Sequence, residues 1–255
     1  MRRRGTREAP EWGRSKLLAV LVTGIAGVML AVCGLALGVY YSVLADPGDA
    51  AAQHAADEPA DEEMPAGERH TAEAARPGDL TTEQFAEIVL PAPEVLGPAG
   101  VSSGFPRSPE GALAQLVAID QHVLQSASVD TAQRVITEWA VPGGPTAESW
   151  SGVHAVAALL SSAGVTRDGS AALTVSASPE MGLVDSGGGD EVLACVNFVV
   201  TASMTKTASV AAADCQRMTW VDGRWMIAAG PEPEQAPSVW PGTEAALQAG
   251  YRVLR

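Results

Sequence analysis

The longest hydrophobic stretch of the chain lies near its start. Residues 17–45, from Leu17 to Ala45, contain no charged side chain. At about 1.5 Å per residue, a helix of this length spans the roughly 30 Å hydrocarbon core of a bilayer. Basic residues dominate positions 1–16, and no basic residue follows the run until Arg69. The positive-inside rule therefore predicts a cytoplasmic tail at 1–16, a transmembrane helix at 17–45 and an extracellular C-terminal domain.

Two other interpretations of this run are weighed against a membrane span. A cleaved signal peptide has an apolar core of about 7–15 residues before a site of small residues. Val43-Leu44-Ala45 offers such a site, but the run is too long for that core. A lipid anchor at Cys33 would fall in the middle of the span. We therefore expect the run to stay in the lipid bilayer of the cell membrane.

Small residues recur along one face of the predicted span, at Gly27, Ala31, Gly34 and Gly38. Spacings of three and four residues place them on one side of a helix, where backbones of two helices can approach closely. This pattern indicates a helix–helix contact, either self-association or contact with another membrane protein. Alanine-rich apolar spans also contain such spacings by chance.

After the span, the pattern of large apolar residues disappears and then returns. Residues 46–103 are rich in Ala, Pro and acidic residues, so we expect an acidic spacer, with one short helix at 82–90. In residues 104–230, apolar residues first recur at the spacing of helices. Ser108 and Pro109 are typical of a helix start. Apolar spacings predict helices to about residue 126, over 131–140 after a cap at Asp130, and from a cap at Thr146 to about 163.

The periodicity then changes to that of strands. We expect strands at 171–178, 191–203 and 208–220, and Asp222-Gly223 predicts a tight hairpin into a fourth strand. Three helices followed by an antiparallel meander predict an α+β domain, with the helices packed on a curved four-stranded antiparallel sheet. Residues 231–255 form a Pro-rich tail with a short helix at 244–254.

Composition and charge narrow the possible partners. The chain has a formal net charge of −14, and the excess of acid lies after the predicted span. An acidic outer domain disfavours nucleic acid as its partner. Arg greatly outnumbers Lys, and Ala, Gly and Pro are abundant, which is typical of a high-GC genome such as that of an actinobacterium.

The predicted sheet brings two cysteines together. If strands 191–203 and 208–220 form a hairpin centred on Thr205, Cys195 lies directly opposite Cys215. Side chains in that position point to the same face and are close enough to bridge, and disulfides persist outside the cell. We expect a disulfide rather than two buried thiols. Two cysteines without a histidine pair do not predict a metal site.

No arrangement of residues predicts catalysis. The segment Gly100-Val101-Ser102-Ser103-Gly104 matches the G-x-S-x-G pattern, but it follows a linker rather than the buried strand that a nucleophile elbow needs. Several acids could act in proton transfer, and no spacing singles out a pair: Asp120, Glu138, Glu148, Asp185, Asp190, Glu191 and Asp214. Asp214 and His154 could meet inside a cone-shaped fold. The tryptophans at 139, 150, 220 and 225 are expected to pack in the core or on the sheet.

The predicted domain resembles the nuclear transport factor 2-like fold. A basic tail, one span, a spacer and such a domain resemble two groups of membrane proteins. One comprises the type IV secretion or conjugation assembly proteins and their Gram-positive counterparts, and the other the actinobacterial Mce-associated membrane proteins. The segment GFPRSPEGALAQLVAI, at 104–119, is similar to the opening motif of conjugative-element proteins. Neither resemblance implies catalytic residues or a cofactor, and the fold itself also hosts enzymes.

Two functions remain open at this point. The first is a non-enzymatic, single-pass scaffold whose outer domain contacts other proteins of a cell-envelope assembly, such as a conjugative transfer apparatus. The second is a small-ligand-binding or isomerase-like protein that uses a cavity of the same fold. A scaffold should expose apolar residues. An enzyme should place a buried acid of shifted pKa at the mouth of an apolar pocket.

Overall fold

The computed structural model describes residues 72–167, 169–185 and 191–255. The predicted span and its small-residue face, with Gly27, Ala31, Gly34 and Gly38, lie outside the described residues. Within this part of the chain, no helix has the length and apolar character needed to cross a bilayer.

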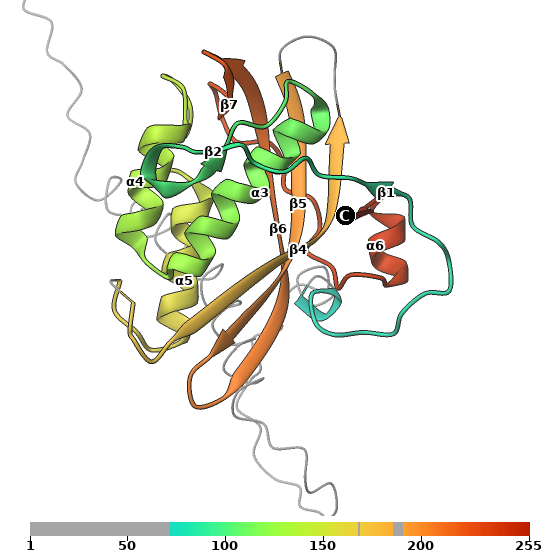
Figure 1. The fold of residues 1–255 in the computed structure, drawn as a ribbon. Helices are drawn as coiled ribbons and strands as arrows, with labels where there is room; N and C mark the ends of the chain where they lie inside the picture. Colours follow the sequence, from blue (N-terminus) through green and yellow to red (C-terminus); the bar gives the residue numbers. More distant parts are fainter. Residues whose placement is uncertain (1–71, 168, 186–190) are drawn as a thin grey trace, which may run out of the picture.

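The centre of the domain is an antiparallel meander of four strands (Figure 1). These are β4 (Thr174–Asp185), β5 (Glu191–Ser203), β6 (Thr207–Val221) and β7 (Arg224–Ile227). β4 also pairs with β8 (Arg252–Leu254), which runs parallel to β1 (Glu87–Ile88). The result is a mixed six-stranded sheet, in the order β1-β8-β4-β5-β6-β7.

The α+β class and the four-stranded meander are confirmed, but the sheet is larger than predicted. β1 and β8 have two and three residues, too few for an alternating pattern to be read from the sequence. The helix predicted at 82–90 was wrong, because backbone bonds from Val253 to Ala86 and from Leu90 to Arg255 hold this stretch extended. The helix predicted at 244–254 is shorter, since α6 (Glu244–Gln248) is followed by a left-handed residue at Gly250 and then by β8.

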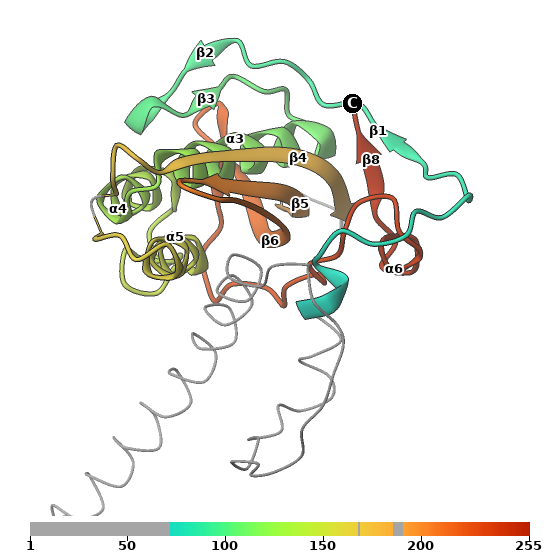
Figure 2. The ribbon, with the colours of Figure 1, turned by 90° about the horizontal axis from the view of Figure 1, so that it is seen from below.

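Three helices pack on one face of the meander (Figures 1 and 2). They are α3 (Pro109–Ser126), α4 (Val129–Trp139) and α5 (Ser151–Ser162). The Ser108 hydroxyl accepts a bond from the Gly111 amide, which confirms the predicted cap of α3. Ser128, rather than Asp130, caps α4. α5 begins after Trp150 instead of at Thr146, and Trp150 supplies no side-chain cap.

Apolar side chains fill both faces of the sheet. The main core lies between the sheet and α3–α5. Its largest fully buried side chains include Trp139, Trp150, Phe198, Leu113, Leu116, Ile119, Ile136, Leu160, Met218 and Ile227. A smaller cluster on the opposite face contains Met181, Val239, Ala246 and Tyr251. A register shift between Pro179 and Met181 separates the part of β4 that faces the helices from the part that reaches this second cluster.

Part of the predicted spacer belongs to the domain. Within residues 80–103, β2 (Val95–Leu96) and β3 (Ser102–Ser103) form a hairpin around a short 3-10 helix, η1 (Pro98–Gly100). Val101 is fully buried in the main core, and the Trp139 indole donates to the Pro98 carbonyl at 3.1 Å. The folded domain therefore starts before Gly104. The sequence conceals this because prolines at 91, 93 and 98 interrupt the apolar residues of the segment and leave no regular periodicity.

The chain enters the domain beside β6. The Ala211 amide donates to the Ala75 carbonyl, and the Trp240 amide donates to the Ala74 carbonyl, both at 2.7 Å. Residues 72–76 therefore attach to the edge of β6 and to the C-terminal tail. In Figure 2 this entry lies on the opposite side of the domain from β2.

Candidate functional site

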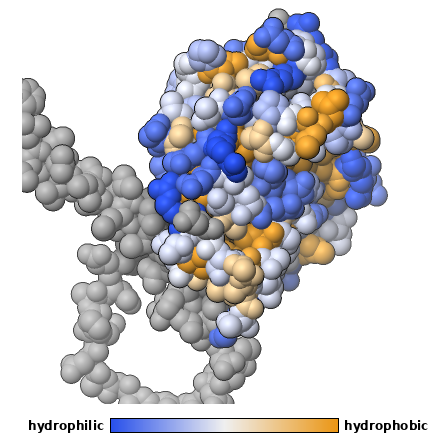
Figure 3. Space-filling model, turned by 60° about the vertical axis from the view of Figure 1, so that its left-hand side comes forward, coloured by the Kyte–Doolittle hydropathy of each residue, from blue (hydrophilic) through white to orange (hydrophobic). Residues whose placement is uncertain are grey.

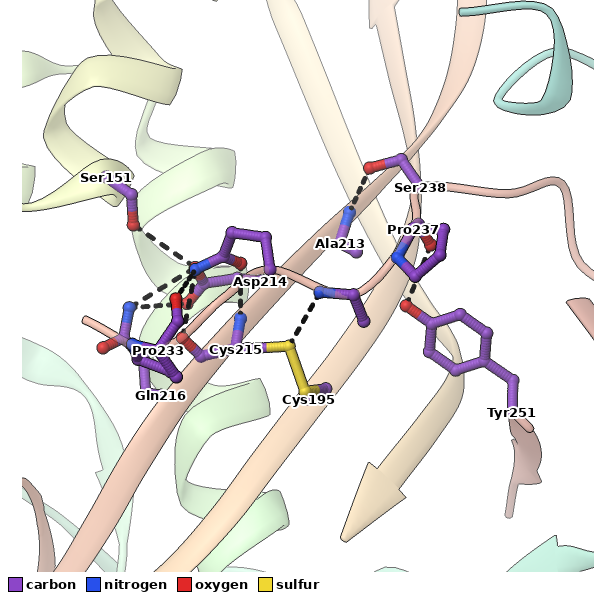
Figure 4. The surroundings of a disulfide bond; sticks show 12 residues. Ser151, Cys195, Ala213, Asp214, Cys215, Gln216, Pro233, Pro237, Ser238 and Tyr251 are labelled. Atoms are coloured by element: carbon purple, nitrogen blue, oxygen red, sulfur yellow. Dashed lines mark hydrogen bonds between the residues drawn. A yellow bond between two sulfur atoms is a disulfide. The ribbon is translucent and has the colours of Figure 1, made fainter. Parts of the chain in front are cut away.

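The predicted disulfide is present in the sheet. Cys195 on β5 and Cys215 on β6 are direct partners in the antiparallel register, with an S–S distance of 2.07 Å and a Cα–Cα distance of 4.0 Å. The register that the hairpin argument predicted is therefore confirmed. Both cysteines lie on the sheet face that the C-terminal tail covers (Figure 4).

A Pro-rich segment of the tail, residues 231–240, covers the disulfide and the free edge of β6; we call it the strap. The Ala236 amide donates to Cys215 Sγ at 3.2 Å. The Gln235 side chain accepts a bond from the Cys215 amide at 2.8 Å and donates to the Cys215 carbonyl at 3.2 Å. The Ser238 hydroxyl accepts a bond from the Ala213 amide at 2.9 Å. Side chains of the strap thus bind the backbone groups of β6 that a neighbouring strand would otherwise pair. The prolines of the strap have no amide hydrogen with which to form such a ladder.

On the other face of β6, three carboxyl groups from distant parts of the chain gather where α5 begins. Asp120 comes from α3, Asp214 from β6 and Glu232 from the strap. The Ser151 hydroxyl contacts Glu232 Oε1 at 2.7 Å and Asp214 Oδ1 at 3.3 Å. The Gln216 amide contacts Glu232 Oε1 at 2.8 Å and Asp214 Oδ2 at 3.2 Å. We call these residues the carboxyl cluster.

Glu232 also caps α5. Its two carboxylate oxygens accept bonds from the Ser151 amide at 3.2 and 3.1 Å. This amide belongs to the first turn of a helix whose own N-cap, Trp150, offers no side-chain bond. A carboxylate there satisfies a free backbone donor and lies at the positive end of the helix dipole. The start of α5 therefore holds Glu232, and with it the strap.

Donors are scarce in the carboxyl cluster. The Ser151 hydroxyl carries one hydrogen and lies near two carboxyl groups, and the Gln216 amide is shared between the same two groups. A proton held by Asp214 removes the repulsion between the pair and supplies a further donor. Asp214 and Glu232 therefore compete for the same two side-chain donors.

Burial explains the proton affinity of the two aspartates. Loss of solvation, with the nearby negative charges of Asp214 and Glu232, raises the pKa of Asp120 well above its usual value. Loss of solvation also raises the pKa of Asp214 to about 6, with Glu232 adding to the rise and the bonds from Gln216, Ser151 and the Cys215 amide opposing it. Asp120 Oδ2 is buried and has no hydrogen-bond partner among the described residues.

The arrangement can hold and release a proton, and it differs from a metal site or an open pocket. Within the described residues, no group of three His, Cys, Asp or Glu side chains is placed to hold a metal ion. A cavity of about 320 Å³ lies between α3 and residues 90–105, and a second of about 450 Å³ lies beside α4. None of the three carboxyl groups lines either cavity.

The other residues considered from the sequence lie apart from the cluster. His154 is exposed on α5 and does not meet Asp214. Glu138, Glu148, Asp185 and Glu191 are exposed, and Asp190 lies outside the described residues. Ser102 belongs to β3 rather than to a strand-to-helix elbow, so the G-x-S-x-G match carries no nucleophile geometry.

The tryptophans pack as expected. Trp139, Trp150 and Trp225 are buried in the core, and Trp220 makes an edge-to-face contact with Trp225, with ring centroids 5.3 Å apart.

The role of Glu232 and Gln216 could not be read from the sequence, because no spacing links a proline-rich tail to the start of a helix about 80 residues earlier.

The segment that precedes α3 exposes several large apolar side chains. Val89, Val95 and Leu96, in the segment around β1 and β2, are 70%, 59% and 74% exposed. We call these three residues the apolar ridge. The face shown in Figure 3 carries separate hydrophobic patches among hydrophilic residues.

Comparison with known proteins returned no match: neither a protein family, nor a curated protein, nor a solved structure is similar to the chain at a significant level.

Proposed function

We propose that the chain is a non-enzymatic, single-pass membrane protein whose extracellular domain, of nuclear transport factor 2-like type, binds other proteins of a cell-envelope assembly such as a conjugative transfer apparatus. The uncharged run at 17–45 and the basic residues before it support the anchor and its orientation. The apolar ridge supports protein–protein contact. Its occupant would be a second protein that presents apolar side chains to β2.

The exposure of the ridge is the observation on which this proposal rests. Scattered single apolar residues are normal on a protein surface. Here Val95 and Leu96 are adjacent on an edge strand, and both side chains are exposed. A cavity that lies between this segment and α3 is lined by apolar residues such as Leu90 and by polar ones such as Gln121 and His122. Exposed apolar residues beside a surface cavity are typical of an interaction surface.

The filled interior of the domain also supports binding through the outer surface. Trp139 and Trp150 are fully buried between the sheet and the helices. Both indoles pack within one continuous apolar core. We therefore assign contact with the partner to the ridge rather than to the inside of the cone.

Site-specific photocrosslinking tests this assignment. A photoreactive amino acid at position 96 of the full chain, activated in intact cells, should give a discrete crosslinked product of higher mass. Met204, at the turn between β5 and β6, is a matched control because it is also a large exposed apolar side chain, at 44%. Position 204 should give no such product, and Val95→Asp should abolish the product formed from position 96.

Equal crosslinking from positions 96 and 204 would count against the ridge as a specific surface. A product containing only this polypeptide would indicate self-association. Absence of any product from position 96 in intact cells would contradict the proposal. Retention of the domain's disulfide in each variant verifies that the fold is intact.

The alternative function, a small-ligand or isomerase-like site, draws on the raised pKa values of Asp120 and Asp214. Groups that hold a proton near neutral pH are suited to acid–base chemistry. This function requires an apolar cavity that reaches the carboxyl cluster. Xenon binds in dry apolar cavities, so a crystal of the protein pressurised with xenon tests for one. Xenon bound beside Asp120 would favour this alternative.

A further inference from the structure

Two sets of hydrogen bonds attach the strap to the domain. Along the edge of β6, Gln235 and Ser238 bind backbone groups of Cys215 and Ala213. At its start, Glu232 binds the first turn of α5 and Gln216. The first set uses neutral groups. The second set places a carboxylate of the strap against two carboxyl groups that belong to the body of the domain.

Acidic side chains from three different elements face the attachment at Glu232. Asp120 faces the cluster from α3, Asp214 faces it from β6, and Glu232 enters from the strap. α5 contributes the uncharged Ser151 and the buried Trp150, while His154 on the same helix is exposed. Arg217 binds the Ala229 and Pro231 carbonyls rather than a carboxylate. The contacts described at the cluster therefore include no ion pair that would compensate a second or third negative charge.

We propose that the strap is a proton-dependent cover, which stays closed over the β6 edge and the disulfide while Asp214 is protonated and opens when that proton is lost. Asp120 and Asp214 are fixed on a helix and a long strand, whereas Glu232 is on a segment without regular secondary structure. When Asp214 is ionised, Glu232 loses donors and gains a like charge nearby. Glu232 is therefore the group that moves into solvent, and the strap moves with it.

Opening has two structural consequences. The amides of Ala213 and Cys215 lose the Ser238 and Gln235 oxygens that they bind in the closed state. The sulfur of Cys215, which is fully buried, loses its cover. Both changes can be measured on the full chain.

The rate of disulfide reduction by a phosphine measures the cover directly. The phosphine attacks one sulfur and is oxidised to the phosphine oxide with oxygen from water, and the two cysteines become thiols. The rate in the full chain, divided by the rate for a small linear disulfide at the same pH, should rise roughly tenfold between about pH 5 and about pH 8. Asp214→Asn and Glu232→Gln should both make this normalised rate independent of pH.

Glu234→Gln is the matched control, because Glu234 is an exposed carboxylate on the same strap and is not part of the cluster. Its pH dependence should equal that of the unmodified chain. A normalised rate that does not change with pH in the unmodified chain would overturn the proposal. So would a pH dependence that survives in both Asp214→Asn and Glu232→Gln.

Hydrogen exchange in the unmodified chain gives a second measurement that needs no variant. After correction for the intrinsic effect of pH, the Ala213 and Cys215 amides should lose protection roughly tenfold over the same pH range. The amide of Val196, in the central strand β5, should not change. Parallel loss at all three amides would indicate global unfolding and overturn a local cover.

Discussion

The side chain of Gln235 binds both backbone polar groups of Cys215, as the backbone of a neighbouring strand would. Its oxygen accepts the Cys215 amide at 2.8 Å and its nitrogen donates to the Cys215 carbonyl at 3.2 Å. The Ser238 hydroxyl likewise accepts a bond from the Ala213 amide, two residues earlier on β6. An edge that would otherwise offer free hydrogen-bonding groups to another chain is thus closed by side chains of a proline-rich segment.

Replacing Gln235 should weaken this edge. In Gln235→Ala, two backbone groups of Cys215 lose their partners, so we expect the free energy of unfolding to fall by about 1–2 kcal/mol. Denaturant unfolding of the full chain measures this change. Glu234→Ala, next to it on the strap, should change stability by less than about 0.5 kcal/mol. Equal effects of the two substitutions would show that the Gln235 bonds contribute little.

Stability should fall as the pH rises through the range set by Asp214. Folding raises the pKa of this carboxyl from 3.8 to about 6, so the folded state binds the proton more tightly than the unfolded state. The resulting stabilisation is fully present below about pH 4 and is lost as the pH rises through about 6. The raised pKa of Asp120 acts in the same direction. Unfolding curves between about pH 4 and pH 8 should show this slope, and Asp214→Asn should reduce it.

Removing the disulfide should destabilise the domain. The paired change Cys195→Ala with Cys215→Ala opens a loop with a sequence separation of 20 residues, and the chain-entropy estimate for such a loop is about 3 kcal/mol. Denaturant unfolding of oxidised, reduced and double-alanine proteins provides the comparison. A double-alanine protein as stable as the oxidised protein would show that the native packing, not the bridge, sets stability there.

Gly111 should not tolerate even a methyl group. A Cβ at this position would collide with the Pro106 carbonyl oxygen, which belongs to the backbone and cannot move aside alone. We therefore expect Gly111→Ala to cost about 1–3 kcal/mol or more, since α3 must shift from the chain that precedes it. Gly78→Ala is the control, because its Cβ would be 3.6 Å from the nearest atom, a methyl carbon of Thr243. Thermal unfolding of both variants tests the difference.

The sequence was most informative where local periodicity and local chemistry agree. Ser108 and Pro109 marked the start of α3, and the hairpin arithmetic placed Cys195 opposite Cys215. The short strands β1 and β8 could not be predicted, because pairing between distant segments, rather than their own pattern, makes them strands. Residues 80–103 were assigned to a spacer because β2 and β3, with two residues each, are also too short to show a pattern of their own.

The carboxyl cluster was only partly accessible from the sequence. Asp120 and Asp214 were among the candidate acids, but nothing along the chain connects them to each other or to Glu232. Their proximity depends on how α3, β6 and the strap pack around the first turn of α5. His154, which the sequence allowed to meet Asp214, lies on the exposed side of α5 instead.

The position where the chain enters the domain fixes the direction in which β2 faces. Residues 74 and 75 bind Trp240 and Ala211, on the opposite side of the domain from β2 (Figure 2). In the arrangement we propose, an anchor that precedes residue 72 would hold the domain by its β6 side. Val95 and Leu96 would then lie on the side of the domain away from the anchor, where a binding protein can reach them.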